Sequence, residues 1–86
     1  MWVSPREYKS VGSALASARE KAGLTQGQLA RLLRKPQSFV SNYERGHRRI
    51  DVLELLRIVE ALKGDPLAVF AEIAGNRSGG KARPKS

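Results

Sequence analysis

Apolar residues recur along most of the chain at intervals of three and four, the spacing that places them on one face of an α-helix. No stretch sustains the strict alternation of apolar and polar residues that indicates a half-buried β-strand. Glycine, proline and capping residues divide this pattern into five segments. The pattern therefore predicts an all-α protein, a compact bundle of five helices.

The first predicted helix covers residues 11–22, with Ser10 as its N-cap and Gly23 as its C-terminal stop. Its inward-facing residues are expected to be Leu15, Ala18 or Arg19, and Ala22. Thr25 begins the second helix, because Gln28 three residues later completes a capping box. The apolar stripe of that helix consists of Leu29, Ala30, Leu32 and Leu33.

Pro36 separates the second predicted helix from the third, since proline is tolerated only in the first turn of a helix. The third helix covers residues 37–45 and ends at Gly46. Asp51 caps a fourth helix that stops at Gly64, with apolar residues at Val52, Leu55, Leu56, Val59 and Leu62. A short fifth helix begins at Asp65-Pro66, runs through Ala74 and presents Leu67, Phe70, and Ile73 or Ala74.

Two short helices joined by a tight connection, at residues 25–45, are typical of a helix-turn-helix. In that motif the first helix crosses the DNA backbone and the second lies in the major groove. Ala30 is the small residue expected where the helices cross, and Val40 and Tyr43 anchor the second helix from below. Short polar side chains fall on the opposite face of that helix: Gln37, Ser38, Ser41 and Asn42.

Residues 11–74 resemble the Cro/repressor (Xre-type) helix-turn-helix domains of phage and bacterial regulators. The resemblance is densest at Gly23-Leu24-Thr25-Gln26, Leu29-Ala30, Gln37-Ser38, Ser41, Glu44-x-Gly46 and Leu62. It implies a five-helix bundle of the lambda-repressor-like type that binds double-stranded operator DNA, usually as a homodimer on inverted half-sites.

The resemblance also implies roles for individual residues. Gln37 would contact a base, since a glutamine can bond adenine at two atoms, and Ser38, Ser41 and Asn42 would share the base-reading face. Gln26 would contact a phosphate and support Gln37. The expected contacts to the DNA backbone are Gln26, Arg34, Lys35, Arg45, Arg48 and Arg49. Arg19 and Glu44 match a structural ion pair, and the homodimer would use Leu67, Val69, Phe70 and Ile73 of the fifth helix.

One position departs from the family pattern. Arg34 stands where the family usually has glycine in the turn between the two helices. A residue other than glycine adopts the left-handed conformation there only at a cost in conformational free energy. We therefore expect either that Arg34 is strained in this way or that the turn has another shape.

The charge distribution agrees with a polyanionic partner. The chain has 16 Lys and Arg against 8 Asp and Glu, a formal net charge of +8 in 86 residues. Basic residues concentrate in residues 31–49, where Glu44 is the one acid, and in residues 75–86, which contain no acid. We therefore divide the chain into an N-terminal segment (1–10), the DNA-binding domain (11–74) and a disordered basic tail (75–86).

Composition argues against several other classes of protein. The chain has no cysteine and a single histidine, His47, so neither a metal site nor a catalytic group is expected, and no cofactor is implied. No run approaches the roughly 18 apolar residues that cross a bilayer, and Arg6, Glu7 and Lys9 replace the apolar stretch of a signal peptide. The predicted protein is cytoplasmic, not an enzyme, and a transcriptional regulator, most simply a repressor. Two alternatives stay open: an antitoxin that holds a protein toxin, and a nucleic-acid-binding module of low specificity.

Overall fold

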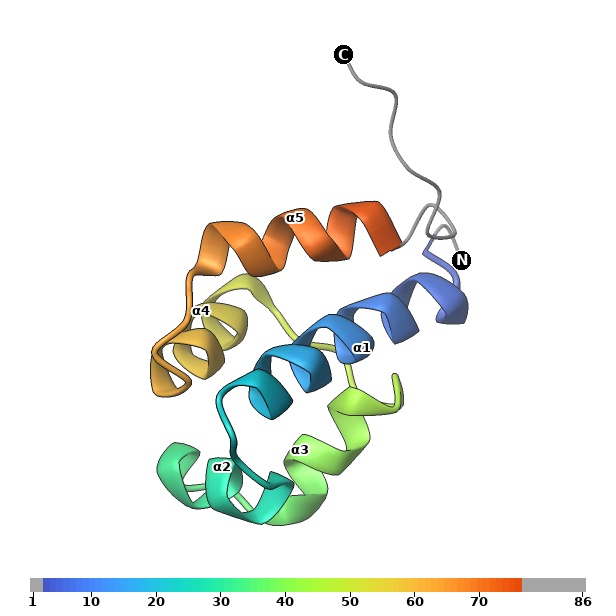
Figure 1. The fold of residues 1–86 in the computed structure, drawn as a ribbon. Helices are drawn as coiled ribbons and strands as arrows, with labels where there is room; N and C mark the ends of the chain where they lie inside the picture. Colours follow the sequence, from blue (N-terminus) through green and yellow to red (C-terminus); the bar gives the residue numbers. More distant parts are fainter. Residues whose placement is uncertain (1–2, 77–86) are drawn as a thin grey trace.

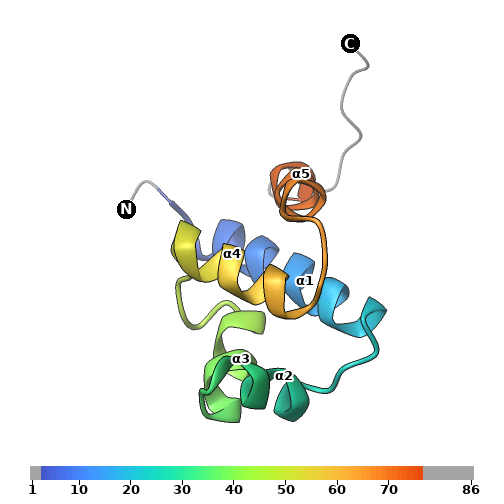
Figure 2. The same cartoon turned by 90° about the vertical axis from the view of Figure 1, so that its left-hand side faces the viewer.

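The helices of the chain form three layers, which the two perpendicular views of Figures 1 and 2 show. The computed structural model describes residues 3–76, and within them the secondary structure consists of five α-helices. These are α1 (Pro5–Lys21), α2 (Gln26–Leu33), α3 (Gln37–Glu44), α4 (Val52–Ala61) and α5 (Pro66–Asn76). Helices α2 and α3 form one layer, α1 and α4 the middle layer, and α5 covers the opposite side. The predicted all-α fold is therefore confirmed.

Helix α1 begins at Pro5, so the prediction that it starts after Ser10 is wrong. Ser4 is the N-cap: its hydroxyl accepts a hydrogen bond from the Glu7 amide, and the Glu7 carboxylate accepts one from the Ser4 amide. This capping box and a proline in the first turn together favour a helix start. Ser10 lies inside the helix, where its hydroxyl donates to the Glu7 carbonyl oxygen over 2.6 Å. The C-terminal end was predicted better, since Ala22 is the C-cap and Gly23 follows with a φ of 78°.

Buried side chains from all five helices form the core. Its fully buried large side chains are Tyr43, Leu15, Leu29, Ile58, Val40 and Val59. Three predicted core positions are wrong: Ala22 is exposed, and Leu32 and Val52 have exposed fractions of 58% and 70%. Leu32 and Val52 lie at the edge of an apolar stripe, where no further helix of residues 3–76 covers them. Ile58, which is absent from the prediction, is buried in the core.

Helix α5 begins at Pro66, as predicted, and extends to Asn76, two residues beyond the predicted end. Val69 faces the core, while Leu67 and Phe70 point outward with exposed fractions of 78% and 61%. Of the predicted basic tail, Gly75 and Asn76 belong to this helix, and the remaining residues lie outside the described part of the chain.

Candidate nucleic-acid interface

The unit formed by α2 and α3 is shaped by its caps and its turn. The Thr25 hydroxyl accepts from the Gln28 amide and the Gln28 side chain accepts from the Thr25 amide, which confirms the predicted capping box. Helix α2 ends at Leu33, and its C-cap, Arg34, has φ and ψ of 59° and 44°. Arg34 thus adopts the left-handed conformation at the position where glycine is usual. Pro36 follows in extended backbone as the N-cap of α3.

Helix α3 is held from its inner face. Val40 and Tyr43 have exposed fractions of 0% and 1%, which confirms both as anchors. On α1, Gly12 lies directly against the end of α3: a Cβ built on it would lie 2.5 Å from the Glu44 carbonyl oxygen and closer still to that of Tyr43. Ala30 is buried as predicted, but Gly12 is the residue that lets two helical backbones approach each other.

The polar residues of α3 differ in their exposure. Gln37 and Ser38, in the first turn, are exposed, whereas Ser41 and Asn42 are half-buried. The first turn of α3 therefore offers its side chains to an outside partner more fully than the second turn does.

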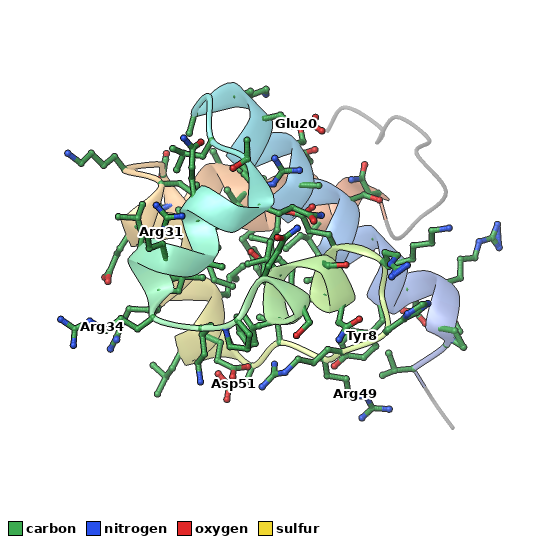
Figure 3. All side chains as sticks on the ribbon, turned by 90° about the horizontal axis from the view of Figure 1, so that it is seen from below. Tyr8, Glu20, Arg31, Arg34, Arg49 and Asp51 are labelled. Atoms are coloured by element: carbon green, nitrogen blue, oxygen red, sulfur yellow. The ribbon has the colours of Figure 1, made fainter. Side chains whose placement is uncertain are left out.

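Basic side chains border this polar face on both sides. Figure 3 views the molecule from the side of α2 and α3, with Arg31 and Arg34 at one edge and Arg49 at the opposite edge. All three are exposed, as are Lys35 and Arg45. Arg31, one turn before Arg34, was not among the predicted backbone contacts, although it belongs to the same exposed basic edge.

Arg48, by contrast, is engaged within the protein. Its guanidinium donates to both carboxylate oxygens of Glu54, at 3.2 and 3.1 Å, and to the Arg49 carbonyl oxygen at 2.7 Å. The same guanidinium lies 4.6 Å from the centroid of the Phe39 ring. Hydrogen bonding to Arg48 lowers the pKa of Glu54. Sequence patterns gave no sign of this pair.

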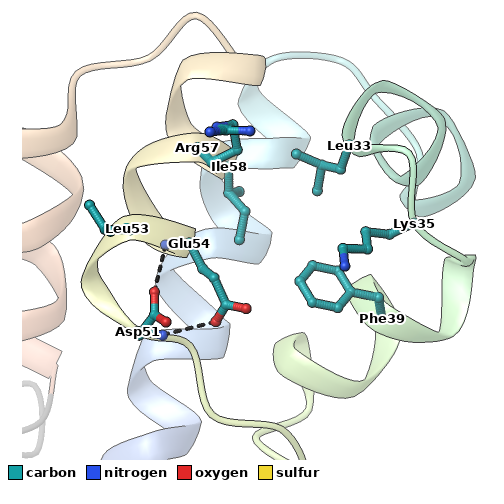
Figure 4. A pocket seen from close by; sticks show the side chains of 8 residues that line it. All are labelled: Leu33, Lys35, Phe39, Asp51, Leu53, Glu54, Arg57 and Ile58. Atoms are coloured by element: carbon teal, nitrogen blue, oxygen red, sulfur yellow. Dashed lines mark hydrogen bonds between the residues drawn. The ribbon is translucent and has the colours of Figure 1, made fainter.

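Phe39 lines a cavity of about 290 Å³ between α2, α3 and α4, shown in Figure 4. The other lining residues are Leu33, Lys35, Asp51, Leu53, Glu54, Arg57 and Ile58. The Lys35 ammonium lies 5.5 Å from the centroid of the Phe39 ring, and the ring makes an edge contact with Tyr43. Phe39 therefore packs toward α4, on the side of α3 away from Gln37.

The early start of α1 places its first turns against the connection between α3 and α4. The Arg49 guanidinium lies 5.1 Å from the centroid of the Tyr8 ring. A Cβ built on Gly46, whose φ is 81°, would lie 3.1 Å from the Lys9 Cα. These contacts fix the connection that carries Arg49 at the edge of the α2–α3 face.

A buried ion pair joins α1 to the end of α3. Arg19 Nε donates to Glu44 Oε2 over 2.8 Å, Arg19 Nη2 donates to Glu44 Oε1 over 3.1 Å, and Arg19 Nη1 donates to the Leu24 carbonyl oxygen. The two side chains have exposed fractions of 12% and 6%. Hydrogen bonding to Glu44 raises the pKa of Arg19. Gln26 Nε2 also donates to Glu44 Oε1, over 2.9 Å, and Gln37 Nε2 donates to Gln26 Oε1 over 3.5 Å.

Among residues 3–76, no group of three His, Asp or Glu side chains is arranged to hold a metal ion. No helix in this range has the length and apolar character needed to cross a membrane.

Comparisons with known proteins agree with this geometry. A family model described as helix-turn-helix matches residues 15–68. The clp gene regulator ClgR from C. glutamicum superposes with a TM-score of 0.76 at 30% identity, covering 81% of this chain and 91% of that one. An XRE-family like protein from Pseudomonas syringae pv. tomato str. DC3000 superposes with a TM-score of 0.71 at 37% identity, and the match covers 81% of this chain and 85% of that one. The restriction-modification controller protein C.AhdI from Aeromonas hydrophila superposes with a TM-score of 0.65 at 33% identity, and the match covers 71% of this chain and 92% of that one. A search of curated proteins finds no match.

Proposed function

The chain belongs to the Xre-type helix-turn-helix family of DNA-binding transcriptional regulators, and from that premise we propose that it is a repressor that occupies an inverted-repeat operator as a homodimer. The observation that carries the proposal is the polar first turn of α3, exposed between two edges of basic side chains. ClgR and C.AhdI are described as a gene regulator and a controller protein. Occupation of a promoter would exclude RNA polymerase by steric overlap.

In this proposal α3 is the recognition helix. Gln37 and Ser38 make the main base contacts in the major groove, and Ser41 and Asn42 approach the bases from the second turn. Gln26 at the start of α2 meets a phosphate with the help of the free amides there. Arg34 and Lys35 hold the backbone at one edge of the groove, and Arg45 and Arg49 hold it at the other. Arg48 also contacts the DNA backbone, through the guanidinium N–H groups that are not bonded to Glu54.

The homodimer would form through α5. Leu67 and Phe70 expose large apolar side chains on the layer opposite α2, and such a face favours association. Val69 is buried within the protomer and Ile73 is half-buried, so the dimer contact rests mainly on Leu67 and Phe70. Two copies on one duplex would place their recognition helices in successive major grooves, one helical turn apart.

Selection of bound sequences from random DNA tests the proposal directly. We expect an enriched inverted repeat with half-site centres separated by about 10 base pairs or a multiple of that distance. The Gln37→Ala variant should lose about 1–3 kcal/mol of binding free energy at the selected site, with less loss on random DNA. A reporter promoter that overlaps the site should be repressed. Selection without an enriched motif would contradict the proposal and favour a module of low specificity.

A further inference from the structure

A groove runs between α2 and α4, beside the face that we propose binds DNA. It consists of two adjoining hollows, the cavity of about 290 Å³ that Phe39 lines and a second one of about 500 Å³. Leu33 and Arg57 line both hollows. Figure 4 shows the first hollow, with Leu33 and Lys35 on one side and Arg57 on the other. The remaining residues that line the second hollow are Leu32, Arg34, Glu60 and Ala61.

Large apolar side chains are exposed along this groove. Leu32 on α2 and Leu53 on α4 have exposed fractions of 58% and 76%. The lining between them is also largely apolar, since it includes Leu33, Phe39 and Ile58. Exposed apolar side chains that gather on one surface favour association with another molecule. A groove between two helices, with an exposed leucine on each, fits the apolar face of a third helix.

The charged side chains of the groove favour an acidic partner. Two of its acids are already bonded: the Asp51 carboxylate accepts from the Glu54 amide, and the Glu54 carboxylate accepts from Arg48. Glu60 is the remaining acid of the lining. The groove also has three basic residues that form no ion pair with any carboxylate of residues 3–76, and these are Arg34, Lys35 and Arg57.

We propose that this groove holds an acidic amphipathic helix of a protein partner, and that this partner competes with DNA for Arg34 and Lys35. The competition rests on the proposed function, in which both residues hold the DNA backbone. Apolar side chains of the partner, spaced three and four residues apart, fill the groove, and its carboxylates pair with the basic residues. A basic side chain that is paired with a carboxylate is not available to a phosphate, so the partner releases the protein from its operator.

A labelled synthetic peptide of about 15 residues, long enough to form a helix, is the probe. It carries leucines at intervals of three and four residues and glutamates at the other positions. The control peptide has the same composition in an order that gives no apolar face. Fluorescence anisotropy should show that the amphipathic peptide binds at least about tenfold more tightly than its control. Equal affinities would show that charge alone attracts the peptides and would overturn the proposal.

Variants of exposed residues locate the bound peptide without disturbing the core. Leu53→Ser should weaken peptide binding by about tenfold and leave the affinity for DNA unchanged. Leu67→Ser removes a leucine of similar exposure from α5 and is the matched control, with peptide binding unchanged. Arg57→Gln should weaken peptide binding by about threefold and reduce its dependence on salt. A loss of peptide binding in Leu67→Ser but not in Leu53→Ser would place the peptide on α5 and overturn the proposal.

A competition assay separates this proposal from the proposed function. Unlabelled amphipathic peptide should displace the unmodified protein from its selected DNA site, whereas the same concentration should not displace Leu53→Ser. Peptide binding without displacement would overturn the competition and leave the proposed function standing. If no DNA site is selected, the proposed function fails, and the anisotropy measurements still test the groove. A lower molar mass of Leu53→Ser in light scattering would assign the groove to a second copy of this chain and overturn the proposal.

Discussion

Arg48 and Glu54 form a two-pronged ion pair across the connection between α3 and α4, with N–O distances of 3.2 and 3.1 Å. The pair neutralises one of the cations in the most basic part of the chain, and the Phe39 ring holds the guanidinium from the other side. Glu54 therefore limits how much of the charge of Arg48 is available to a phosphate.

Glu54→Gln is expected to increase affinity for DNA of any sequence, because it releases Arg48. A glutamine keeps the capping box with Asp51, so α4 should remain intact. The slope of log affinity against log salt should steepen by about 0.9 if Arg48 gains a phosphate. Glu20→Gln, at an exposed position near the end of α1, makes the same change of charge away from α3 and α5 and serves as the control. Equal slopes for the two variants would contradict the prediction.

The same pair should contribute to stability in a pH-dependent way. Because the pKa of Glu54 is lowered in the folded protein from 4.5, its contribution is present above about pH 4.5 and is lost as the pH falls through the lower, folded value. The difference in unfolding free energy between the unmodified protein and Glu54→Gln should therefore shrink on acidification. The contribution is small, because the pair is partly exposed. Chemical denaturation at pH 7 and pH 3.5 measures it, and a difference that grows in acid would refute this origin.

Arg34→Gly is expected to raise the free energy of unfolding by about 0.5–1 kcal/mol, since glycine relieves the left-handed strain but adds entropy to the unfolded chain. The same variant should bind DNA more weakly, through the loss of a charge at the edge of α3. Lys63, with a φ of 58° in the connection before α5, provides the matched control. Lys63→Gly should give a similar gain in denaturant melts without the loss in affinity; a parallel loss would show that Arg34 has no specific role.

Gly12→Ala should destabilise the fold by about 1–3 kcal/mol, because the added methyl group meets the backbone of α3. Gly75, in α5, has open space around the position of a Cβ, so Gly75→Ala should be neutral or stabilising by up to about 1 kcal/mol. Thermal melts of the two variants distinguish close packing from helix propensity. Similar melting temperatures for both would show that α1 and α3 can separate at no cost.

Tyr43→Phe should leave stability unchanged or increase it by about 1 kcal/mol. The Tyr43 hydroxyl is buried and has no hydrogen-bond partner among the described residues, and such a group costs free energy. Burial also raises the pKa of Tyr43 above 10.0. Below about pH 10 the hydroxyl is protonated in both the folded and the unfolded state. As the pH rises further the unfolded state loses this proton first, so the free energy of unfolding decreases. Denaturation at pH 8 and pH 11 should show a smaller alkaline loss for the phenylalanine variant; a clear loss of stability at pH 8 would contradict the assignment.

The helices that begin with strong local signals were predicted well. Thr25 and Asp51 each form the capping box that the sequence contains, and Pro66 begins α5. The start of α1 was missed because two serines compete: Ser10 precedes an apolar run, but Ser4 has both Glu7 and a proline. The contacts of Tyr8 and Lys9 with the α3–α4 connection favour the longer helix, and those contacts are long-range.

The candidate interface was predictable in outline but not in its internal pairing. The alternation of buried and polar positions in α3 follows from helical spacing, so Val40 and Tyr43 could be separated from Gln37 in advance. The Arg48–Glu54 pair crosses a loop, and no periodicity relates its two members. Likewise, spacing along α4 places Val52 in the apolar stripe, but its burial depends on whether another helix covers it.

The close approach at Gly12 has a consequence for the evolution of such proteins. Because α3 is held by main-chain contact with α1 and by its inner side chains, an outward position such as Ser38 contributes little to folding. Under the proposed function, substitutions at such a position would change the DNA preference with little effect on folding. Gly12, by contrast, should tolerate few substitutions. We therefore expect mutational scanning to find that substitutions are accepted far less often at position 12 than at position 38.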